Sequence, residues 1–498
     1  MKKDRPNILF ILSDQHAFNI IGSYGNKIIR TPHLDELASN GVSFDNVYTP
    51  SPICLPARMS LLTGKYPFRQ NCWTNSDSLA SDIPTMAHSL GAVGYDPILI
   101  GRLHAIGPDQ LHGFASRKVF DHSSDWYGGS EYTLGILDKA QRPFKESILN
   151  SGPGQMSYEV LDKEVTAETI KYLKKIGSER KNGNKKPFAL QVGFMLPHQP
   201  YVANPNLFRY YEDKVGPPRL GKAISSNKDW LDSWRERTGL NEIKEEDEIR
   251  ARAAYYALVE TLDDLIGKII NSLKENNLFD NTLIIYASDH GEQIGERDLW
   301  WKQTFYEESV KVPLIMSWKD KLPRNQRRKQ ILNLVDLTAT IIDAGQGMEL
   351  SSIDGQSFID TAICNKNKSK NETFSEFCMD NSLSWSDTKE PHLSRMIRSD
   401  SWKFIYYHGY NNQLFNLKND PDEMNNLSGL KEYSKIETKL LKKILKDWKP
   451  LKIKKIMDSK INDKKILKAW AQSVQPSDNY KWKTKAEENW LEKKKMKS

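Results

Sequence analysis

The chain has a cysteine whose surroundings favour a reactive thiol or an anion-binding role. Two prolines keep the approach to Cys54 extended, Pro56 falls where a first helical turn tolerates a missing N–H, and Gly64 falls where a helix can end left-handed. Cys54 is therefore predicted to stand at a helix N-terminus, where free N–H groups and the helix dipole favour negative charge. Arg58, one turn further on, would point back toward the same place. This arrangement suits a nucleophile that faces an oxyanion.

Two apolar stretches far apart in the sequence each end in side chains that could bind a metal ion. Residues 7–12 and 282–287 are continuous apolar runs, which is typical of strands buried on both faces of a parallel sheet. Open α/β sheets bind ligands at the carboxyl ends of their strands, so the side chains after these two strands are expected to meet in one site. Either aspartate taken alone could instead cap a helix. The side chains are Asp14, Gln15, Asp289 and His290.

Three further segments carry side chains suited to an anion. Residues 98–100 form a predicted strand, and Arg102 and His104 after it lie two positions apart, so that in an extended chain both face the same way. Prolines flank His198 and would fix the backbone that aims its imidazole. Lys302 lies among aromatic residues, where a lysine could equally be a surface residue with a buried stem.

Cys54-x-Pro56-x-Arg58, followed by Leu-Leu-Thr-Gly-Lys at 61–65, resembles the signature of the type I sulfatases. In that family the cysteine is oxidised after translation to formylglycine. The hydrated aldehyde offers one hydroxyl to attack sulfur and a second whose deprotonation expels sulfate by breaking a C–O bond. The resemblance therefore implies an enzyme that hydrolyses sulfate esters, together with a maturase that modifies Cys54. Without these matches, a lone cysteine beside proline is more typical of a small buried side chain.

The resemblance also implies a metal site. Its ligands would be the four side chains at the strand ends and an oxygen of modified Cys54. Mainly oxygen ligands with two carboxylate charges suit a hard divalent ion, so Ca²⁺ is expected first, with Mg²⁺ or Mn²⁺ as alternatives. Gln15 and His290 stand where many relatives have Asp and Asn. These departures are similar to the branch that contains choline-sulfatases and phosphonate monoester hydrolases.

The resemblance assigns a catalytic role to the polar side chains around this site. Asp289 would take a proton from the hydrated formylglycine, and His198 would protonate the leaving alcohol. Lys302 would hold the charge that develops on the sulfate, and His104 would support its expulsion. Arg102 stands where the family usually has lysine, so it keeps the charge but changes the geometry. The predicted catalytic residues are Cys54, Arg58, Arg102, His104, His198, Asp289 and Lys302.

Composition limits the other classes of function. Of the 498 residues, 38% are hydrophobic and 27% are charged, which is ordinary for a globular enzyme, and no apolar run approaches the roughly 20 residues that span a bilayer. The formal charge of +8 owes much to a lysine-rich carboxyl third, without a nucleic-acid motif. Four cysteines without a CxxC spacing indicate neither a zinc site nor a disulfide framework. Residues 8–12 are too few for the apolar core of a signal peptide, so a cytoplasmic protein is expected.

The resemblance implies the alkaline-phosphatase-like fold, an α/β sandwich in which a large mixed, mostly parallel sheet lies between helices. A catalytic domain is expected over residues 1–370, followed by a smaller α+β domain with an antiparallel sheet over residues 371–498. The antiparallel strands are predicted around residues 395–397, 403–407 and 413–415, because turn residues separate these short apolar segments.

Aromatic residues continue into the charged carboxyl-terminal tail, at Tyr480, Trp482 and Trp490. Rings of this size are expected to be buried against something, since each could contribute about 2 to 3 kcal/mol. Two docking places are open: the chain's own large domain, and the active-site rim of a neighbouring subunit in a homo-oligomer. Trp126 and Tyr127, in a loop rich in Gly and Ser, are expected to be exposed on the substrate side.

Three functions remain open at this point. The first is hydrolysis of a small organic sulfate, such as choline sulfate, or of a sulfated saccharide. The second is hydrolysis of phosphonate monoesters or phosphodiesters by the same residues, because sulfate and phosphate monoanions are similar in shape. The third is non-catalytic binding of anionic polymers by the basic carboxyl-terminal domain.

Overall fold

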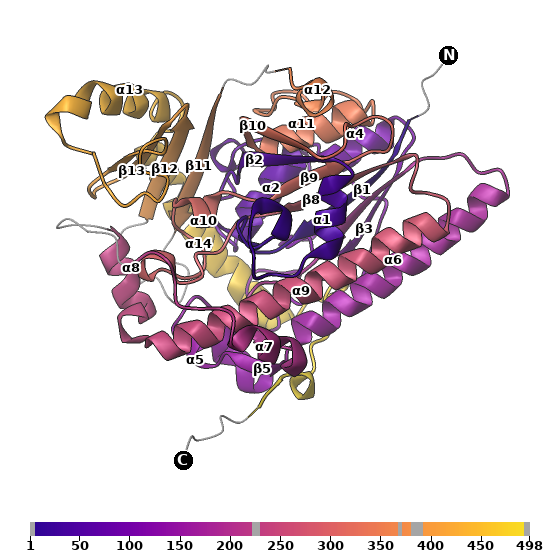
Figure 1. The fold of residues 1–498 in the computed structure, drawn as a ribbon, viewed down its shortest axis with the longest axis horizontal. Coiled ribbons are helices and arrows are strands. Elements are labelled where there is room, and N and C mark those ends of the chain that lie inside the picture. The colour runs from indigo at the N-terminus through magenta and orange to yellow at the C-terminus, as the bar shows by residue number, and fades with distance from the viewer. Residues whose placement is uncertain (1–4, 222–229, 367–370, 380–391, 493–498) are drawn as a thin grey trace.

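An eight-stranded sheet forms the centre of the molecule, with strand order β10-β2-β9-β8-β1-β6-β3-β4 (Figure 1). The computed structural model describes residues 5–221, 230–366, 371–379 and 392–492. Strand β9 runs antiparallel to both of its neighbours, and the other neighbouring strands pair in parallel, so the predicted mixed, mostly parallel sheet is confirmed. The strands are β1 (Asn7–Ser13), β2 (Val42–Tyr48), β3 (Asp96–Gly101), β4 (Ser116–Lys118), β6 (Phe188–Gly193), β8 (Thr282–Ser288), β9 (Leu314–Ser317) and β10 (Gln326–Asn333).

Strand β1 lies between β6 and β8 and is buried on both faces. Successive side chains of a strand point to opposite faces, so Leu9 and Ile11 enter one apolar core while Ile8, Phe10 and Leu12 enter the other. Helices cover both faces, which gives the predicted sandwich. The first core includes residues of α1 (Pro32–Ser39), α6 (Ser157–Lys181) and α9 (Glu245–Glu275), and the second includes residues of α2 (Cys54–Thr63), α4 (Met86–Ala92) and α11 (Leu334–Ala344).

A separate antiparallel sheet follows in the carboxyl-terminal part, in the order β11-β12-β13-β14. The three predicted strands are confirmed as β12, β13 and β14, and β11 adds a fourth that the sequence did not single out. Helix α13 (Ser434–Ile444) packs on this sheet (Figure 1). The domain boundary expected at residue 370 falls within 367–370, outside the described residues. The strands are β11 (Glu372–Met379), β12 (His392–Ser399), β13 (Trp402–Tyr407) and β14 (Gln413–Asn416).

After the long helix α14 (Pro450–Val474), the carboxyl-terminal tail packs against residues from the first third of the chain. Strand β15 (Trp490–Leu491) pairs with β5 (Gly152–Gln155), and the backbone N–H of Trp482 donates to the carbonyl of Asp121 at 2.6 Å. The tail therefore docks on its own chain, the first of the two expected places. Trp126 and Tyr127, expected to be exposed, are both half-buried, and Trp126 packs edge-on against Trp470 at 5.3 Å between ring centres.

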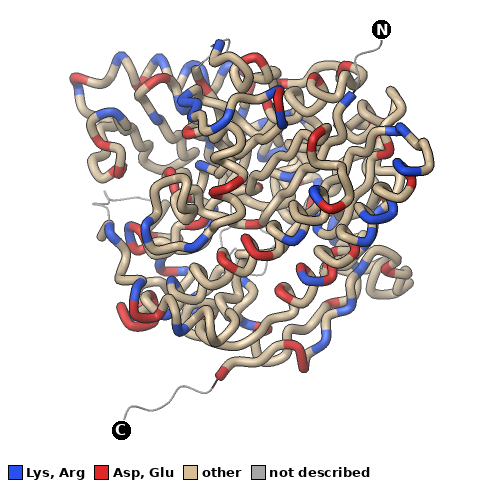
Figure 2. The backbone as a smooth tube through the Cα atoms, turned by 45° about the vertical axis from the view of Figure 1, so that its right-hand side comes forward, with Lys and Arg blue, Asp and Glu red and all other residues tan. Residues whose placement is uncertain are grey.

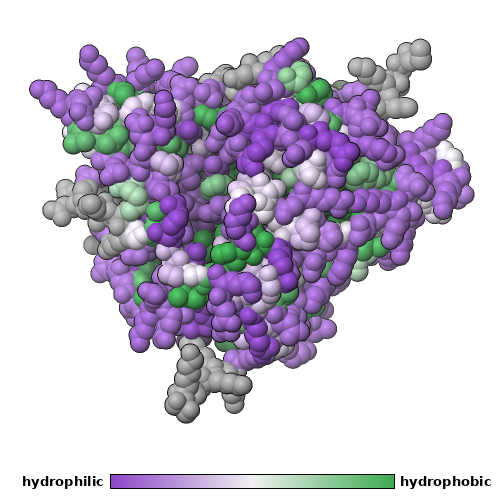
Figure 3. All heavy atoms as spheres, in the orientation of Figure 1, coloured by the Kyte–Doolittle hydropathy of each residue, from purple (hydrophilic) through white to green (hydrophobic). Residues whose placement is uncertain are grey.

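The surface is mostly hydrophilic in the view of Figure 3, and its apolar patches are small. Acidic and basic residues are interspersed along the backbone (Figure 2). In the part of the chain that the structure describes, every helix is too short or too polar to cross a membrane.

A buried lysine joins the carboxyl-terminal sheet to the segment that follows Lys302. Lys403 on β13 is fully buried, and its Nζ lies 2.7 Å from a carboxylate oxygen of Glu307 and 2.5 Å from one of Glu423. The same Nζ donates to the carbonyl of Phe305 at 2.8 Å. Since buried charges are costly unless they are paired, the two carboxylates depend on this lysine.

Lys403→Met is accordingly expected to lower the free energy of unfolding by about 3 to 5 kcal/mol, because it leaves two buried carboxylates without their main cation. Denaturant unfolding would measure the loss. Lys418→Met, which removes an exposed lysine from the same part of the chain, is the control and should change stability by less than about 0.5 kcal/mol. Equal stability of the two variants would contradict the assignment.

Candidate active site

Cys54 is the first residue of α2, as predicted. Ile53 before it is extended, and Gly64 at the other end has φ 69°, the left-handed conformation that the sequence indicated. The helix lies in the interior, and Cys54 is only 1% exposed. Its thiol therefore lies at the N-terminus of a buried helix.

The carboxyl ends of β1 and β8 bring the predicted metal ligands to this helix. The two strands pair in parallel up to Ser13 and Ser288, so Asp14 and Asp289 leave the sheet side by side. Position 54 is an unmodified cysteine here, and its Sγ stands where an oxygen of an oxidised side chain would lie. The Sγ atom is 3.6 Å from Asp14 Oδ1 and 3.2 Å from His290 Nε2.

The donor atoms present fit one divalent ion. Asp14, Cys54, Asp289 and His290 each offer a ligand atom, these atoms all lie within 4.8 Å of one another, and the four side chains are buried. Gln15 has φ 69°, and its Oε1 accepts a hydrogen bond from Lys302 Nζ at 2.6 Å. Two carboxylates, one imidazole and an oxygen at position 54 make a donor set suited to a hard or borderline cation.

Two buried arginines balance the carboxylates. Arg58 Nε donates to Asp289 at 2.7 Å and its Nη2 donates to Asp14 at 3.1 Å, while Arg102 Nε donates to Asp14 at 2.6 Å. Burial by itself would raise the pKa of the Asp14 carboxyl. The positive charges around it, with Arg102 the largest contribution, outweigh burial and hold this pKa well below its usual value. This environment favours the ionised form of Asp14.

Asp121 supports the Arg102–His104 segment and was missed by the sequence reasoning. Its carboxylate pairs with Arg102 Nη1 at 3.2 Å and accepts the backbone N–H groups of Leu103 at 3.0 Å and His104 at 2.7 Å. Arg102 Nη2 lies 2.9 Å from His104 Nδ1, so the two predicted anion-facing side chains are indeed neighbours. Burial, reinforced by the charge of Arg102, lowers the pKa of His104 well below its usual value.

The docked tail contacts the backbone of Asp121, because the carbonyl of Asp121 accepts the N–H of Trp482. Truncation after Ser477 is therefore expected to raise the Michaelis constant several-fold and to lower the melting temperature. Steady-state kinetics, thermal unfolding and size-exclusion chromatography would measure these changes. Lys483→Ala, at an exposed tail position, is the control. Kinetic loss accompanied by loss of an oligomer would show instead that the tail acts on a neighbouring subunit.

His198 approaches Cys54 from the loop after β6. Its Nδ1 lies 2.6 Å from the carbonyl of Gln199, and its side chain lines the same cavity as Cys54. Burial, followed by the charge of Lys302, lowers the pKa of His198. Lys302 Nζ donates to Cys54 Sγ at 3.0 Å. All the residues predicted for the site therefore lie around one thiol.

Cys54 opens into a cavity of about 280 Å³. The polar and aromatic side chains that line it, besides Cys54, include Asn75, Arg102, His104, His122, Tyr132, Arg142, Tyr158, His198 and Lys302.

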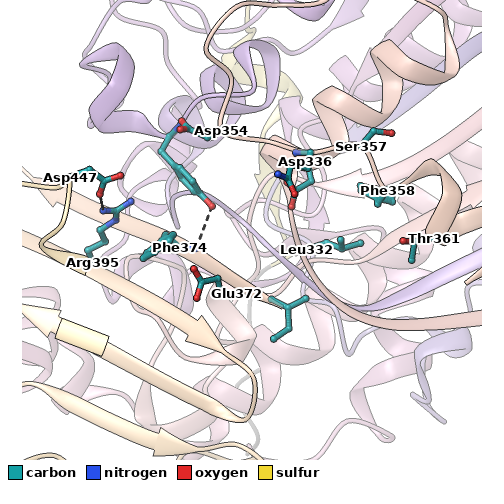
Figure 4. Close-up of a pocket in the computed structure, with 13 residues that line it drawn as sticks. Leu332, Asp336, Asp354, Ser357, Phe358, Thr361, Glu372, Phe374, Arg395 and Asp447 are labelled. Atoms are coloured by element: carbon teal, nitrogen blue, oxygen red, sulfur yellow. Dashed lines mark hydrogen bonds and ion pairs between the residues drawn. The ribbon is translucent and has the colours of Figure 1, made fainter. Parts of the chain in front are cut away.

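A second cavity, of about 190 Å³, lies between the carboxyl-terminal sheet and the region of α11 and α12 (Ile359–Cys364) (Figure 4). Arg395 and Asp447 form an ion pair of 3.0 Å on one side of it, and Asp336 lies on the other. Among the described residues that line this cavity, none was predicted to be catalytic. The cavity at Cys54, by contrast, is lined by five of the predicted catalytic residues.

Comparison with known proteins identifies the family. A sequence profile of the sulfatases matches residues 6–348, which include every predicted site residue. The chain belongs to the sulfatase family. A second profile, of the carboxyl-terminal region of N-sulphoglucosamine sulphohydrolase, matches residues 295–449 of this sulfatase.

The sulfatase also has named relatives over most of its length. It is 32% identical to choline-sulfatase of Rhizobium meliloti, with 86% of this chain and 83% of the relative covered. It is 26% identical to an arylsulfatase of Clostridium perfringens, with 89% and 94% covered. The predicted family and the class of sulfuric ester hydrolase are thereby confirmed.

The sulfatase's fold has a solved counterpart in the phosphonate monoester hydrolase of Agrobacterium radiobacter. The TM-score is 0.70 at 22% identity, with 89% of this chain and 95% of that chain covered. This likeness confirms the expected alkaline-phosphatase-like fold.

Proposed function

We propose that this sulfatase hydrolyses sulfate esters through a formylglycine formed at position 54 and one divalent metal ion. One observation carries the proposal: Asp14, His290 and Lys302 converge within 3.6 Å of Cys54 Sγ, at the N-terminus of a buried helix. A plain cysteine in this position could attack sulfur but would have no second hydroxyl with which to release sulfate.

The proposed metal ion is Ca²⁺, with Mg²⁺ and Mn²⁺ as alternatives. Asp14, Gln15, Asp289 and His290 would hold it together with an oxygen of residue 54. When bound, it would lower the pKa of that oxygen and neutralise charge on the sulfate group. The Oε1 of Gln15 faces Lys302 in the structure, so this side chain could contribute an oxygen to both the ion and the ammonium.

The side chains of this chain then have distinct tasks. Asp289, held by Arg58, takes the proton from the attacking hydroxyl. Lys302 and Arg102 stabilise the negative charge of the sulfate oxygens, and they do so inside a buried site where charges interact strongly. His198 places a proton at the ester oxygen as the alcohol leaves. His104 supports the later expulsion of sulfate.

The cavity supports a small alcohol group, such as a small organic sulfate or the end of a sulfated saccharide. Its volume of about 280 Å³ can take the sulfate together with a small organic group. The relative named choline-sulfatase supports the first of these. The proposal also requires a maturase that converts Cys54 into formylglycine.

A panel of choline, aryl and monosaccharide sulfates, assayed beside an aryl phosphonate, tests the proposal. Faster turnover of one or more sulfates is expected. Faster turnover of the phosphonate would favour the alternative phosphonate or phosphodiester hydrolase. Absence of turnover on every ester, with position 54 modified, would overturn both and leave the binding of anionic polymers.

A further inference from the structure

Glu292 is a fully buried carboxylate directly behind the proposed metal ligands, and the proposed mechanism gives it no role. It lies two residues after His290, beyond the end of β8. Its two oxygens accept four hydrogen bonds from three separate segments of the chain. In each of these contacts the other residue donates the hydrogen. Each oxygen of the Glu292 carboxylate accepts two of the four hydrogen bonds. The donors are Gln15 Nε2, Tyr201 Oη, Ile294 N and Trp301 N.

The contact with Gln15 fixes which way its side-chain amide points. The Nε2 of Gln15 donates one hydrogen to Glu292 and the other to Gln199 Oε1, the latter at 2.7 Å. With both amide hydrogens used on this side, Oε1 must turn to the opposite side, where Lys302 Nζ lies at 2.6 Å. A flipped amide would instead present hydrogens to the ammonium and to the ion.

The other contacts reach the two segments that carry His198 and Lys302. Tyr201, which donates to Glu292 at 2.8 Å, lies three residues after His198. Trp301, whose backbone N–H donates at 2.6 Å, immediately precedes Lys302. One carboxylate therefore links the ends of β1 and β8 with the His198 and Lys302 loops.

We propose that Glu292 is the positioning residue of this site: it holds the Gln15 carbonyl toward the metal ion and Lys302, and it fixes the spacing of the His198 and Lys302 loops. This role rests on the proposed function. Partners of this kind that orient metal ligands typically contribute 10- to 100-fold to metal affinity or activity.

The test compares Glu292→Gln with Glu296→Gln. The first substitution would place an NH₂ group opposite the amide of Gln15, which would flip that amide and turn its hydrogens toward Lys302. Glu296 is a matched control, since it is buried in the same segment and accepts the backbone N–H groups of Arg219 at 3.2 Å and Leu220 at 2.8 Å. Calorimetric titration of the metal-free proteins with Ca²⁺, and separately with Mn²⁺, measures affinity, and steady-state assays measure kcat and KM.

Glu292→Gln is expected to weaken metal binding about 10- to 100-fold and to lower kcat more than it changes KM. Glu296→Gln should keep both values within about twofold of wild type. Wild-type metal affinity in Glu292→Gln, or an equal loss in Glu296→Gln, would overturn the proposal.

Tyr201→Phe separates positioning from charge. It removes one of the donors to Glu292 but leaves the carboxylate in place, so a smaller loss of metal affinity in the same direction is expected. An unchanged affinity would mean that Glu292 acts through its charge alone, and it would also overturn the proposal. The variant decides the question even if Glu292→Gln fails to fold. Calorimetry needs no turnover, so an absence of sulfate-ester hydrolysis by wild type would refute the proposed function separately.

Discussion

Cys54→Ala is expected to lower kcat/KM for sulfate esters by about 10⁴-fold or more, because it removes the side chain that is placed to attack sulfur. The fold should persist, since a small buried thiol contributes little volume. Cys72→Ala is the matched control: Cys72 is also buried, and burial raises its pKa to about 12, which leaves it an unreactive thiol. This control should retain full activity.

Mass spectrometry of the peptide covering residues 49–65 tests the same prediction chemically. An active preparation should show the aldehyde in place of the thiol, and the fraction modified should follow the specific activity. Full turnover by uniformly unmodified cysteine would contradict the proposed mechanism.

Asp14→Asn and Asp289→Asn are each expected to abolish measurable metal binding and to reduce hydrolysis by about 10³-fold or more, because each removes one of the two carboxylates of the cage. Treatment of wild type with a chelator should inactivate it, and added Ca²⁺ or Mn²⁺ should restore it. A rate that chelation leaves unchanged would show that the cage is wrong.

The consequences for stability should differ between the two variants. Asp14 pairs with both Arg58 and Arg102, whereas Asp289 pairs with Arg58. The loss of Asp14 therefore breaks two buried ion pairs and the loss of Asp289 breaks one, so a larger loss of stability is expected for Asp14→Asn. Asp264→Asn is the control, because Asp264 belongs to the other group of possible ligands among the described residues, with His33 and Asp263. Metal binding and rate should not change in this control.

Much of the central fold could be predicted because its signals are local. The apolar runs at 7–12 and 282–287 are β1 and β8, and the turn-bounded helix at Cys54 is α2. A continuous apolar run indicates burial on both faces, and a sheet edge brings strand ends together. These two rules were enough to bring Asp14 and Asp289 to one site, whereas their ion pairs with Arg58 were not predicted.

The supporting partners could not be predicted in the same way. Asp121 and Glu292 act through long-range contacts with backbone N–H groups and side chains, and such contacts leave no periodic pattern in the sequence. Trp126 illustrates the same limit, since its ring packs against Trp470, which lies on a helix near the other end of the chain. The aromatic residues of the tail predicted that their rings are buried, but they did not indicate the surface on which the tail docks.

The position of β1 has a consequence for how the chain is made. Strand β1 is synthesised before the other described strands of the sheet, although it is an inner strand, and Thr282, the partner of Asn7 in β8, follows 275 residues later. At typical synthesis rates this interval lasts roughly 15 to 55 seconds. During that time an apolar strand has an unpaired edge, which is a template for aggregation. Yield in a foreign host should therefore depend on chaperone capacity and on slower synthesis at lower temperature.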